Sequence, residues 1–185
     1  MTLTTERLEL SPPRESDVDA IYAACLDADL QRYTTIPSPY ERHHAEGFVT
    51  KTREWWDAGS ETTWAIREGG ALVGMIGLHG LGRGSGEIGY WMARTARGRG
   101  LLTEAARAVV EWGFAPDGAR LERIEWRAVV GNLPSARTAR TLGFRFEGTM
   151  RRALVNGAGR RDDGWIAGLL PTDERVPQPW SVLES

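Results

Sequence analysis

The spacing of apolar residues along the chain changes repeatedly between the two-residue period of a strand and the 3.6-residue period of a helix. Alternation over residues 3–10, ended by Pro12 and Pro13, predicts a first strand, and a helix capped by Ser16 or Asp17 follows it. The other elements expected in this half are a loop at 36–39, a helix at 41–57 and strands at 62–67, 71–81 and 86–92. Short glycine-containing turns between these three strands predict antiparallel hairpins.

The second half of the chain alternates helices with strands. A basic, glycine-rich loop at 94–100 leads into a helix at 101–114, and a strand at 123–130 follows, with its even-numbered residues turned to one side. A helix at 134–142, ended by Gly143, and a hairpin of strands at 144–154 and 161–170 complete the pattern. The tail from Pro171 is expected to be extended along the surface or frayed. We therefore expect an α/β fold with one domain at 1–170 and a C-terminal extension at 171–185.

Charge and composition exclude several classes of protein. The 23 basic and 25 acidic residues leave a net charge of -2, which argues against a general nucleic-acid or anionic-membrane binder. No apolar run reaches the roughly 20 residues of a membrane-spanning helix. The opening residues lack the basic and apolar regions of a signal peptide. Because Cys25 is the single cysteine and no disulfide can form within the chain, a cytoplasmic protein is expected.

No metal cofactor is expected. His43 and His44 are neighbours on the predicted helix at 41–57 and point about 100° apart, so they cannot chelate one ion together. Cys25 lies on the apolar stripe of its helix, which favours packing in the core over nucleophilic catalysis. Eight tryptophans and 22 glycines in 185 residues indicate instead a protein with a cleft, because large flat side chains occur together with bare backbone.

The loop at 94–100 has the composition of a phosphate-binding loop. The first amides of the helix that follows lack partners within the helix, and the helix dipole adds partial positive charge there. Gly98 and Gly100 let a phosphate approach these amides, and Arg94, Arg97 and Arg99 add charge. A solvated basic loop with glycines for a tight turn explains the same residues. The P-loop and Rossmann glycine patterns are both absent, so those two nucleotide sites are excluded.

The order of these features resembles the GNAT N-acetyltransferases, in their ribosomal-protein N-terminal acetyltransferase (RimJ/RimL-type) branch. The family signature Gln/Arg-x-x-Gly-x-Gly/Ala matches Arg97, Gly100 and Leu102, with leucine where a small residue is usual. The resemblance runs from about residue 3 to residue 170. It implies a central, mixed, mostly antiparallel sheet flanked by helices, in which the strand at 86–92 splays from the strand at 123–130 and the pantetheine arm of acetyl-CoA inserts between them.

The resemblance also implies where acetyl-CoA binds. The residues expected to contact it are Trp91, Met92, Ala93, Arg97, Gly98, Arg99, Gly100, Leu101, Leu102, Thr103, Asn132 and Ser135. For Trp91 a plain core aromatic is the alternative, and for Asn132 the alternative is a cap of the next helix. Arg137 and Arg140 could meet CoA phosphates, although a solvated helix face is favoured.

Two residues are the expected catalytic groups. Glu87 is the candidate base for the amine, and a surface ion pair is its alternative interpretation. Ser135 is the candidate that binds the CoA sulfur or protonates the leaving thiolate. Tyr90 is a second candidate acid, but strand alternation places it on the opposite face from Glu87.

The acceptor groove is expected between the first two helices and the last hairpin. The substrate-binding candidates are Tyr33, Trp55, His79 and Glu87, and Trp56, Arg151, Arg152 and Trp165 lie in the same regions. These residues do not select one acceptor, so a peptide N-terminus and a small amine both remain open.

The resulting expectation is an N-acetyltransferase that transfers an acetyl group from acetyl-CoA to a primary amine by direct attack. The alternative is a non-catalytic acyl-CoA sensor or interaction module on the same fold, which would carry the same loop. The near-neutral charge disfavours an RNA-associated protein, and no membrane partner is expected. A homodimer is compatible with the resemblance, since dimers are common in the branch.

Overall fold

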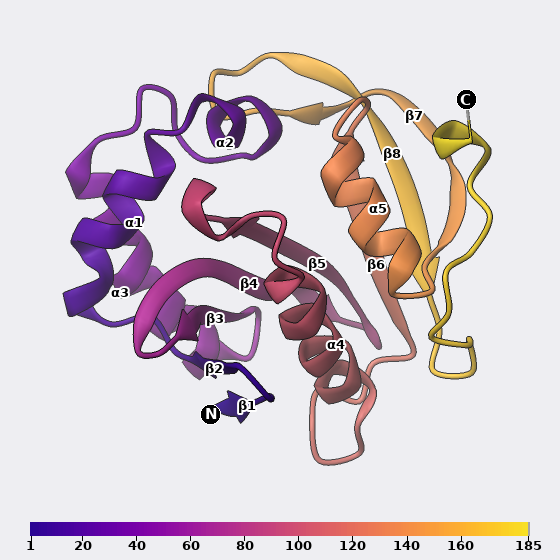
Figure 1. Cartoon of the computed structure of the whole chain (residues 1–185), viewed down its shortest axis with the longest axis horizontal. Helices are drawn as coiled ribbons and strands as arrows, with labels where there is room; N and C mark the ends of the chain where they lie inside the picture. The colour runs from indigo at the N-terminus through magenta and orange to yellow at the C-terminus, as the bar shows by residue number, and fades with distance from the viewer. Residues whose placement is uncertain (185) are drawn as a thin grey trace.

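The computed structural model describes residues 1–184, which form an eight-stranded sheet with helices on its two faces (Figure 1). The strands lie in the order β1-β2-β3-β4-β5-β6-β8-β7. Their bounds are β1 (Leu3–Thr4), β2 (Leu8–Ser11), β3 (Thr62–Glu68), β4 (Ala71–Gly82), β5 (Ser85–Met92), β6 (Arg123–Val129), β7 (Arg145–Val155) and β8 (Arg161–Leu169). Every neighbouring pair is antiparallel except β5 and β6, so the mixed, mostly antiparallel sheet is confirmed.

Five α-helices and three short 3-10 helices connect these strands within the described residues. The α-helices are α1 (Val18–Cys25), α2 (Ala28–Tyr33), α3 (Arg42–Ala58), α4 (Leu101–Phe114) and α5 (Leu133–Thr141). The 3-10 helices are η1 (Glu15–Asp17), η2 (Arg94–Ala96) and η3 (Ser181–Leu183). The predicted helix at 101–114 is confirmed at both ends.

The single strand predicted at 3–10 is wrong, because the segment is a tight hairpin of β1 and β2. Leu3 pairs with Leu10 across this hairpin. Thr5 closes the turn, since its amide donates to the carbonyl of Leu8 at 2.9 Å and its hydroxyl oxygen accepts from the amide of Leu8 at 3.1 Å. The turn residues Thr5, Glu6 and Arg7 include no glycine, proline, asparagine or aspartate, so no turn signal in the sequence revealed it.

Helix α2 was not predicted. It has six residues and buries only Leu30, so it has too few turns to show a helical period. Its start is fixed by Asp27, whose Oδ1 accepts from the amides of Asp29 and Leu30 at 3.0 and 3.1 Å. This is the side-chain capping that short helices need.

Asp17 does not cap α1, contrary to one of the two expected caps. Both of its carboxylate oxygens accept from the guanidinium of Arg67 on β3, each at 2.7 Å. Arg67 also donates to Ser11 Oγ at 2.9 Å. All three side chains are buried, so this group ties the start of α1 to the middle of the sheet.

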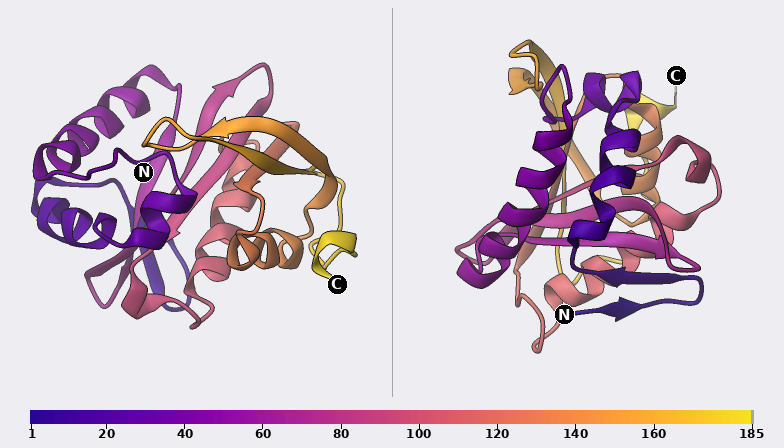
Figure 2. Two further views of the ribbon diagram at one scale, coloured as in Figure 1. Left: turned by 90° about the horizontal axis from the view of Figure 1, so that it is seen from above. Right: turned by 90° about the vertical axis from the view of Figure 1, so that its left-hand side faces the viewer.

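Two apolar layers cover the two faces of the sheet. Even-numbered residues of β3 to β6, such as Trp64 and Trp126, pack with α4 and α5 in the larger layer. Odd-numbered residues such as Ala65 and Met75 pack with α1 and α3 in the smaller one. Figure 2 shows α1 and α3 beside the sheet and the β7–β8 hairpin reaching over it towards them.

The C-terminal tail lies along the surface over residues 171–179, as expected, but Trp180 anchors it in the core. Trp180 is fully buried, and its indole nitrogen donates to the carbonyl of Phe144 at 2.9 Å. Its ring lies 5.4 Å from the ring of Trp126 and 5.4 Å from that of Phe146, measured between centroids. Residue 170 is therefore not a boundary of the hydrophobic core. No helix within residues 1–184 has the length and apolar character needed to cross a bilayer.

The predicted strand at 123–130 ends one residue early. Val129 is buried as the last residue of β6, whereas Val130 is exposed, contrary to the expected pattern. The chain turns directly afterwards at Gly131, which has a φ of 93°. Gly143 has the same φ of 93° after α5, as its predicted role at a helix end requires.

Candidate active site

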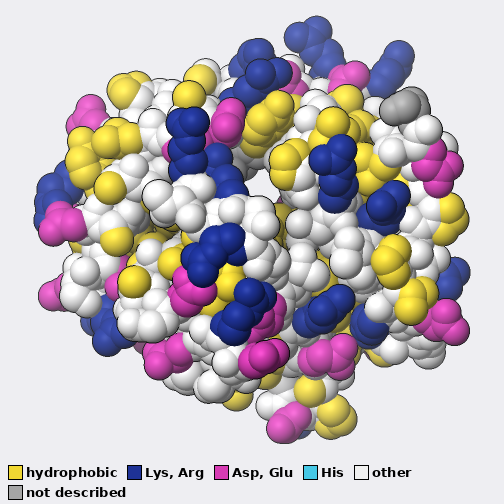
Figure 3. All heavy atoms as spheres, in the orientation of Figure 1, with side chains coloured by type: hydrophobic (Ala, Val, Ile, Leu, Met, Phe, Trp, Pro, Cys, Tyr) yellow, Lys and Arg dark blue, Asp and Glu magenta, His cyan; other side chains and the backbone are white. Residues whose placement is uncertain are grey.

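Strands β5 and β6 lie side by side only over the first half of β5. Their parallel register begins at Ser85 and Arg123 and stops at Ile88 and Trp126. The remainder of β5, from Gly89, has no partner on that side, so the splay implied by the resemblance is confirmed. Figure 3 shows an opening near the centre of this face, in the region where Figure 1 draws the end of β5 beside α5.

The backbone of β5 is directed alternately to β4 and to the gap. The amide of Ala93 donates to the carbonyl of Val73 on β4 at 2.9 Å. Because hydrogen-bonded pairs alternate in an antiparallel ladder, Trp91 also directs its amide and carbonyl to β4. The backbone amide and carbonyl groups of Tyr90 and Met92 therefore point into the gap. The expectation that Trp91 and Ala93 offer their backbone to the pantetheine arm is wrong, whereas Met92 fits it.

The start of α4 lies directly after this strand and has the geometry expected of an anion site. Gly98 and Gly100 have φ values of 74° and 78°, a left-handed conformation that favours glycine. No side chain caps the first amides of α4, and nothing lies within 4 Å of the position of a Cβ at Gly98. Leu101 and Leu102 pack against the core with their side chains, so the departure at Leu102 leaves the amides of the turn in place.

The arginines of the loop contribute less free charge than the sequence indicated. Arg99 makes two hydrogen bonds, of 2.8 and 2.7 Å, with the carboxylate of Glu68. Arg97 lies 3.2 Å from Asp27 Oδ1 and donates from Nε to the carbonyl of Met92 at 3.1 Å. Arg97 thus holds the loop to the start of α2 and to the end of β5. Within residues 1–184, Arg94 is the loop arginine without a carboxylate at ion-pair distance.

A cluster of hydroxyl groups lies on the α5 side of the gap. Tyr90 Oη is 3.1 Å from Ser135 Oγ, and the indole nitrogen of Trp126 donates to both oxygens at 3.0 Å. Burial raises the pKa of Tyr90 to about 12, more than its hydrogen bonds with Ser135 and Trp126 lower it. The phenol is therefore a hydrogen-bond donor at neutral pH. Sequence reasoning put Tyr90 on this face but did not pair it with Ser135.

Asn132 caps α5, as its alternative interpretation predicted. Its Oδ1 accepts from the amide of Ser135 at 3.4 Å, at the first turn of the helix. The cap fixes the position of Ser135 beside Tyr90. Arg137 is exposed on the same helix, as a solvated face requires.

The opposite face of the gap carries Glu87. Arg127 Nη1 lies 3.7 Å from Glu87 Oε2, but Arg127 is held more closely by Glu125, at 2.7 Å. Burial raises the pKa of Glu87 above its ordinary value, and Glu125 adds to this effect, while Arg127 and His79 act against it. A carboxylate with a raised pKa is a better proton acceptor at neutral pH than an exposed one.

His79 lies directly across the β4–β5 ladder from Glu87. Its Nδ1 is 2.8 Å from Oε2 of Glu61, which precedes β3. Its ring also packs over Gly89, where an added Cβ would meet Nε2 at 2.8 Å. Glu61 was not among the residues expected from the sequence. The one sequence signal that could have identified it is its position directly before a predicted strand.

The residues expected at the acceptor groove differ in their surroundings. Tyr33 and Trp55 are half-buried, on α2 and α3. Trp56 and Trp165 instead belong to the core, where Trp56 packs edge-on to Trp64 at 5.0 Å between centroids. Gly157, at the tip of the β7–β8 hairpin, lies so close to Ile36 that a Cβ there would collide with the Ile36 carbonyl.

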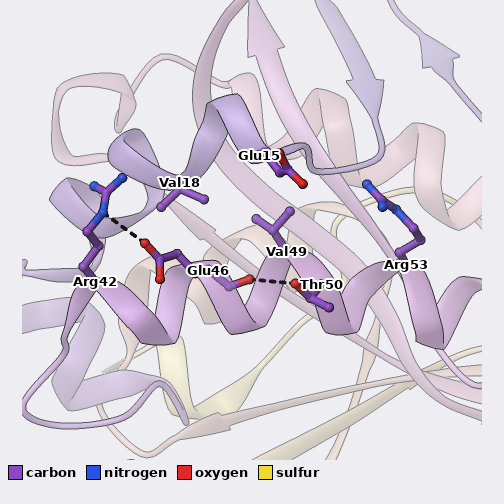
Figure 4. A pocket seen from close by; sticks show the side chains of 7 residues that line it. All are labelled: Glu15, Val18, Arg42, Glu46, Val49, Thr50 and Arg53. Carbon is purple, nitrogen blue, oxygen red and sulfur yellow. Dashed lines mark hydrogen bonds and ion pairs between the residues drawn. The ribbon is translucent and has the colours of Figure 1, made fainter.

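Other features of the molecule lie outside this site. A cavity of about 340 Å³ between η1, α1 and α3 is lined by Glu15, Val18, Arg42, Glu46, Val49, Thr50 and Arg53 (Figure 4), none of which belongs to the gap. No group of side chains in residues 1–184 could hold a metal ion. Cys25 is buried, and burial raises the pKa of its thiol to about 11, which fits the packing role predicted for it.

Comparison with known proteins agrees with this geometry. The family model described as an acetyltransferase (GNAT) domain matches residues 7–145. "Uncharacterized N-acetyltransferase p20" of Bacillus licheniformis is 27% identical over 173 residues, covering 91% of this chain and 96% of that protein. "Putative ribosomal N-acetyltransferase YdaF" of Bacillus subtilis (strain 168) is 40% identical over 91 residues, 48% of this chain and 49% of that protein. The structure of RimL, a ribosomal L7/L12 alpha-N-protein acetyltransferase in complex with coenzyme A, has a TM-score of 0.82 at 22% identity and covers 92% of this chain and 98% of that chain.

Proposed function

The chain belongs to the GNAT acetyltransferase family, and we propose that it acetylates the primary amine of a protein N-terminus at the gap between β5 and β6. As a member of this family it is an N-acetyltransferase that takes its acetyl group from acetyl-CoA. One observation carries the proposal. The two strands diverge beside the uncapped start of α4, with hydrogen-bonded hydroxyl groups on one face and a half-buried carboxylate on the other.

Backbone groups supply most of the binding proposed for acetyl-CoA. The pyrophosphate is proposed to lie against the amides between Gly98 and Thr103, where the α4 dipole and two left-handed glycines favour an anion. The backbone of Tyr90 and Met92 is proposed to pair with the pantetheine arm as a neighbouring strand would. Arg97 and Arg99 hold the loop through their ion pairs, and Asn132 acts through its cap on Ser135.

The two faces of the gap divide the chemistry. Glu87 accepts a proton from the incoming ammonium group, which leaves a lone pair on nitrogen to attack the thioester carbonyl carbon. The new C–N bond forms as the carbonyl π electrons move to oxygen, and the C–S bond breaks when this tetrahedral oxyanion collapses to the amide. Ser135 and Tyr90 share one hydrogen bond, which leaves one of their two hydroxyl protons for a hydrogen bond to the departing sulfur on the other face. The second proton lost by nitrogen balances the one that the thiolate takes up to become free CoA.

A protein N-terminus is favoured as the acceptor by two kinds of support. The relatives include YdaF and RimL, whose names refer to ribosomal substrates. The close approach of Gly157, on the β7–β8 hairpin, to Ile36, shortly after α2, also supports the proposal that this hairpin forms a wall for an extended chain. Tyr33 and Trp55 are proposed to line this wall. Neither the relatives nor the site favours a non-catalytic sensor.

A screen for acetylated products tests the proposal. Purified protein is given acetyl-CoA with N-terminal peptides, or with polyamines, amino acids and aminoglycosides, while free CoA is measured and products are identified by mass spectrometry. Peptides acetylated at the α-amine are the expected result. Turnover on small amines alone would replace the proposed acceptor, and CoA binding without turnover on any amine would favour the sensor.

The surroundings proposed for the enzyme follow from the same features. We propose a cytoplasmic enzyme, supported by the single, buried cysteine. We also propose that one catalytic domain includes the tail, supported by the burial of Trp180. The expected homodimer is tested by light scattering, which measures the molecular mass in solution. A mass equal to one chain would contradict the dimer.

A further inference from the structure

The pair formed by Glu61 and His79 has no part in the chemistry described above. The Nδ1–Oε2 distance of 2.8 Å is that of a direct hydrogen bond between imidazole and carboxylate. An ionised carboxylate only accepts, so the proton of a neutral His79 lies on Nδ1. Nε2 is then left with a free lone pair. A carboxylate that fixes the tautomer and orientation of a histidine in this way is a known arrangement for proton transfer.

The free nitrogen of this histidine lies at the entrance of the gap. Nε2 packs over Gly89, where a Cβ would come within 2.8 Å of Nε2 and within 2.9 Å of Cδ2. Gly89 directly follows Ile88, which is the last residue of β5 paired with β6. Glycine at this position therefore allows the imidazole to reach the point where the strands separate.

Three segments of the chain bring charged side chains to the neighbourhood of the imidazole. Glu61 lies before β3, and Glu87 lies across the ladder on β5, on the same face of the sheet. Arg127 on β6 is 3.7 Å from Glu87, but it is shared with Glu125. Two carboxylates are thus the neighbours of His79, one bonded to it and one across the ladder. About two-fifths of the His79 side chain is exposed, so it is also open to solvent.

We propose that His79, positioned by Glu61, receives the acceptor's proton from Glu87 and releases it to solvent. The inference rests on the proposed function, in which Glu87 takes that proton first. Because Glu87 is the cross-strand neighbour of His79 and not its hydrogen-bond partner, the proton passes through one bridging water. The O–H bond of protonated Glu87 breaks as this water takes the proton and gives one of its own to His79 Nε2, which restores the Glu87 carboxylate and the water. The imidazolium then loses this proton to water. No oxidant, reductant or further reactant is needed, and Glu61 is a positioning residue because it acts through His79.

Substitution with chemical rescue tests the relay. His79→Ala is expected to lower kcat by about 10-fold to 100-fold, within the range for acid–base groups, and to leave the KM for acetyl-CoA unchanged. Imidazole added to the buffer is expected to restore much of this loss. Imidazole should not restore His79→Ala combined with Glu87→Gln, because the group that hands on the proton is then missing. His43→Ala, an exposed histidine on α3, is the matched control.

Two further variants separate positioning from packing. Glu61→Gln is expected to lower kcat in the native background and to have no additional effect in His79→Ala. Its matched control is Glu54→Gln, on the exposed side of α3. Gly89→Ala keeps the histidine but displaces its ring, so it is expected to lower kcat as well. Gly82→Ala on β4, where an added Cβ meets open space, controls for loss of a glycine.

The outcomes distinguish the relay from the proposed function. Native kcat in His79→Ala, or a loss that imidazole does not restore, would overturn the relay while acetylation by the native protein still stands. Additive losses in Glu61→Gln and His79→Ala would remove the positioning role of Glu61. If the native protein acetylates no amine, the proposed function itself fails.

Discussion

At the scale of single residues, the site is defined by what each side chain is bonded to. Tyr90 and Glu87 are three positions apart on one strand, yet alternation sends them to opposite faces of the sheet. One joins a buried cluster with Ser135 and Trp126, and the other faces His79 and Arg127. The strand therefore separates the group proposed for the amine from those proposed for the sulfur.

The first prediction concerns the hydroxyl groups of Ser135 and Tyr90. Ser135→Ala and Tyr90→Phe are each expected to lower kcat by about 10-fold to 100-fold, because each removes one member of the hydrogen-bonded pair that donates to the leaving sulfur. The double variant should lose less than the product of the two effects, since the hydroxyls share one hydrogen bond. Steady-state kinetics with a fixed peptide acceptor measure this. Tyr22→Phe on α1 is the control, and native kcat in both single variants would contradict the assignment.

The buried ion pair makes the second prediction, on stability. Breaking such a pair by Asp17→Asn is expected to cost about 3–5 kcal/mol of the free energy of unfolding, because it leaves Arg67 buried and unpaired. Burial alone would raise the pKa of Asp17, but hydrogen bonds from Arg67 and from the Arg14 amide hold it below 3.8. Its contribution is thus complete above the unfolded-state pKa and is lost as the pH falls through the lower, folded-state value.

Denaturant unfolding at several pH values checks this second prediction. The native protein should lose stability below about pH 4, where the unfolded-state carboxyl takes up its proton. Asp17→Asn should lose less over the same range. The exposed Asp57→Asn on α3 is the control. An equal acid-side slope in Asp17→Asn and the native protein would show that this pair does not carry the effect.

At the scale of elements, long periodic segments were predictable and short ones were not. Helix α4 has an apolar face four turns long, so its bounds followed directly from the spacing of residues 101–114. Helix α2 has one buried residue, and the turn between β1 and β2 contains no glycine, proline, asparagine or aspartate, so neither was predicted. The glycine loop and its place before α4 were visible in the sequence, whereas the ion pairs of Arg97 and Arg99 depend on contacts distant in sequence.

The candidate site divides in the same way. Alternation along β5 placed Glu87 and Tyr90 on opposite faces, because that periodicity is local. The bond from Glu61 to His79 joins residues 18 positions apart through the pairing of β3 with β4, so it follows only from the folded sheet. The assignment of Trp56 and Trp165 to the groove failed because an aromatic near a cleft looks the same in sequence as one in the core.

The start of α4 makes the third prediction. Gly100→Ala places a side chain in a left-handed conformation that costs about 1–2 kcal/mol. The loop is expected to relax and misalign its amides, which raises the KM for acetyl-CoA roughly 10-fold, equivalent to about 1.4 kcal/mol. Gly59→Ala, at the left-handed end of α3, carries the same strain away from the site and is the control. Equal KM values in the two variants would contradict a role for the loop in binding.

At the scale of the whole molecule, the tail closes the fold over the α5 side of the sheet. Trp180 contacts the rings of Trp126 and Phe146, and Trp126 in turn bonds to Tyr90 and Ser135. Trp180, Val182 and Leu183 therefore pack in the core that supports the active site. Trp180 follows Pro177 and Pro179, and the tail carries no periodic pattern of apolar residues. The sequence alone therefore did not indicate that Trp180 lies in the core.

The tail makes the fourth prediction. Trp180→Ala is expected to cost about 3–5 kcal/mol of the free energy of unfolding, as for other buried tryptophans. For a chain of this length that corresponds to a fall in Tm of roughly 6–20 °C. Calorimetry measures it, with the half-buried Trp55→Ala as a comparison that should fall less. A Tm within error of the native value would mean that the tail is not part of the folded core.

The central claim is that the gap between β5 and β6 carries out acetyl transfer, with Glu87 as the first acceptor of the amine's proton. The most direct test measures free CoA and acetylated peptide together, for the native protein and for Glu87→Gln. The native protein is expected to form one acetylated peptide for each CoA released. Glu87→Gln should bind acetyl-CoA with the same Kd but turn over at least about 100-fold more slowly. Unchanged turnover in Glu87→Gln, or CoA release without acetylated peptide, would contradict the claim.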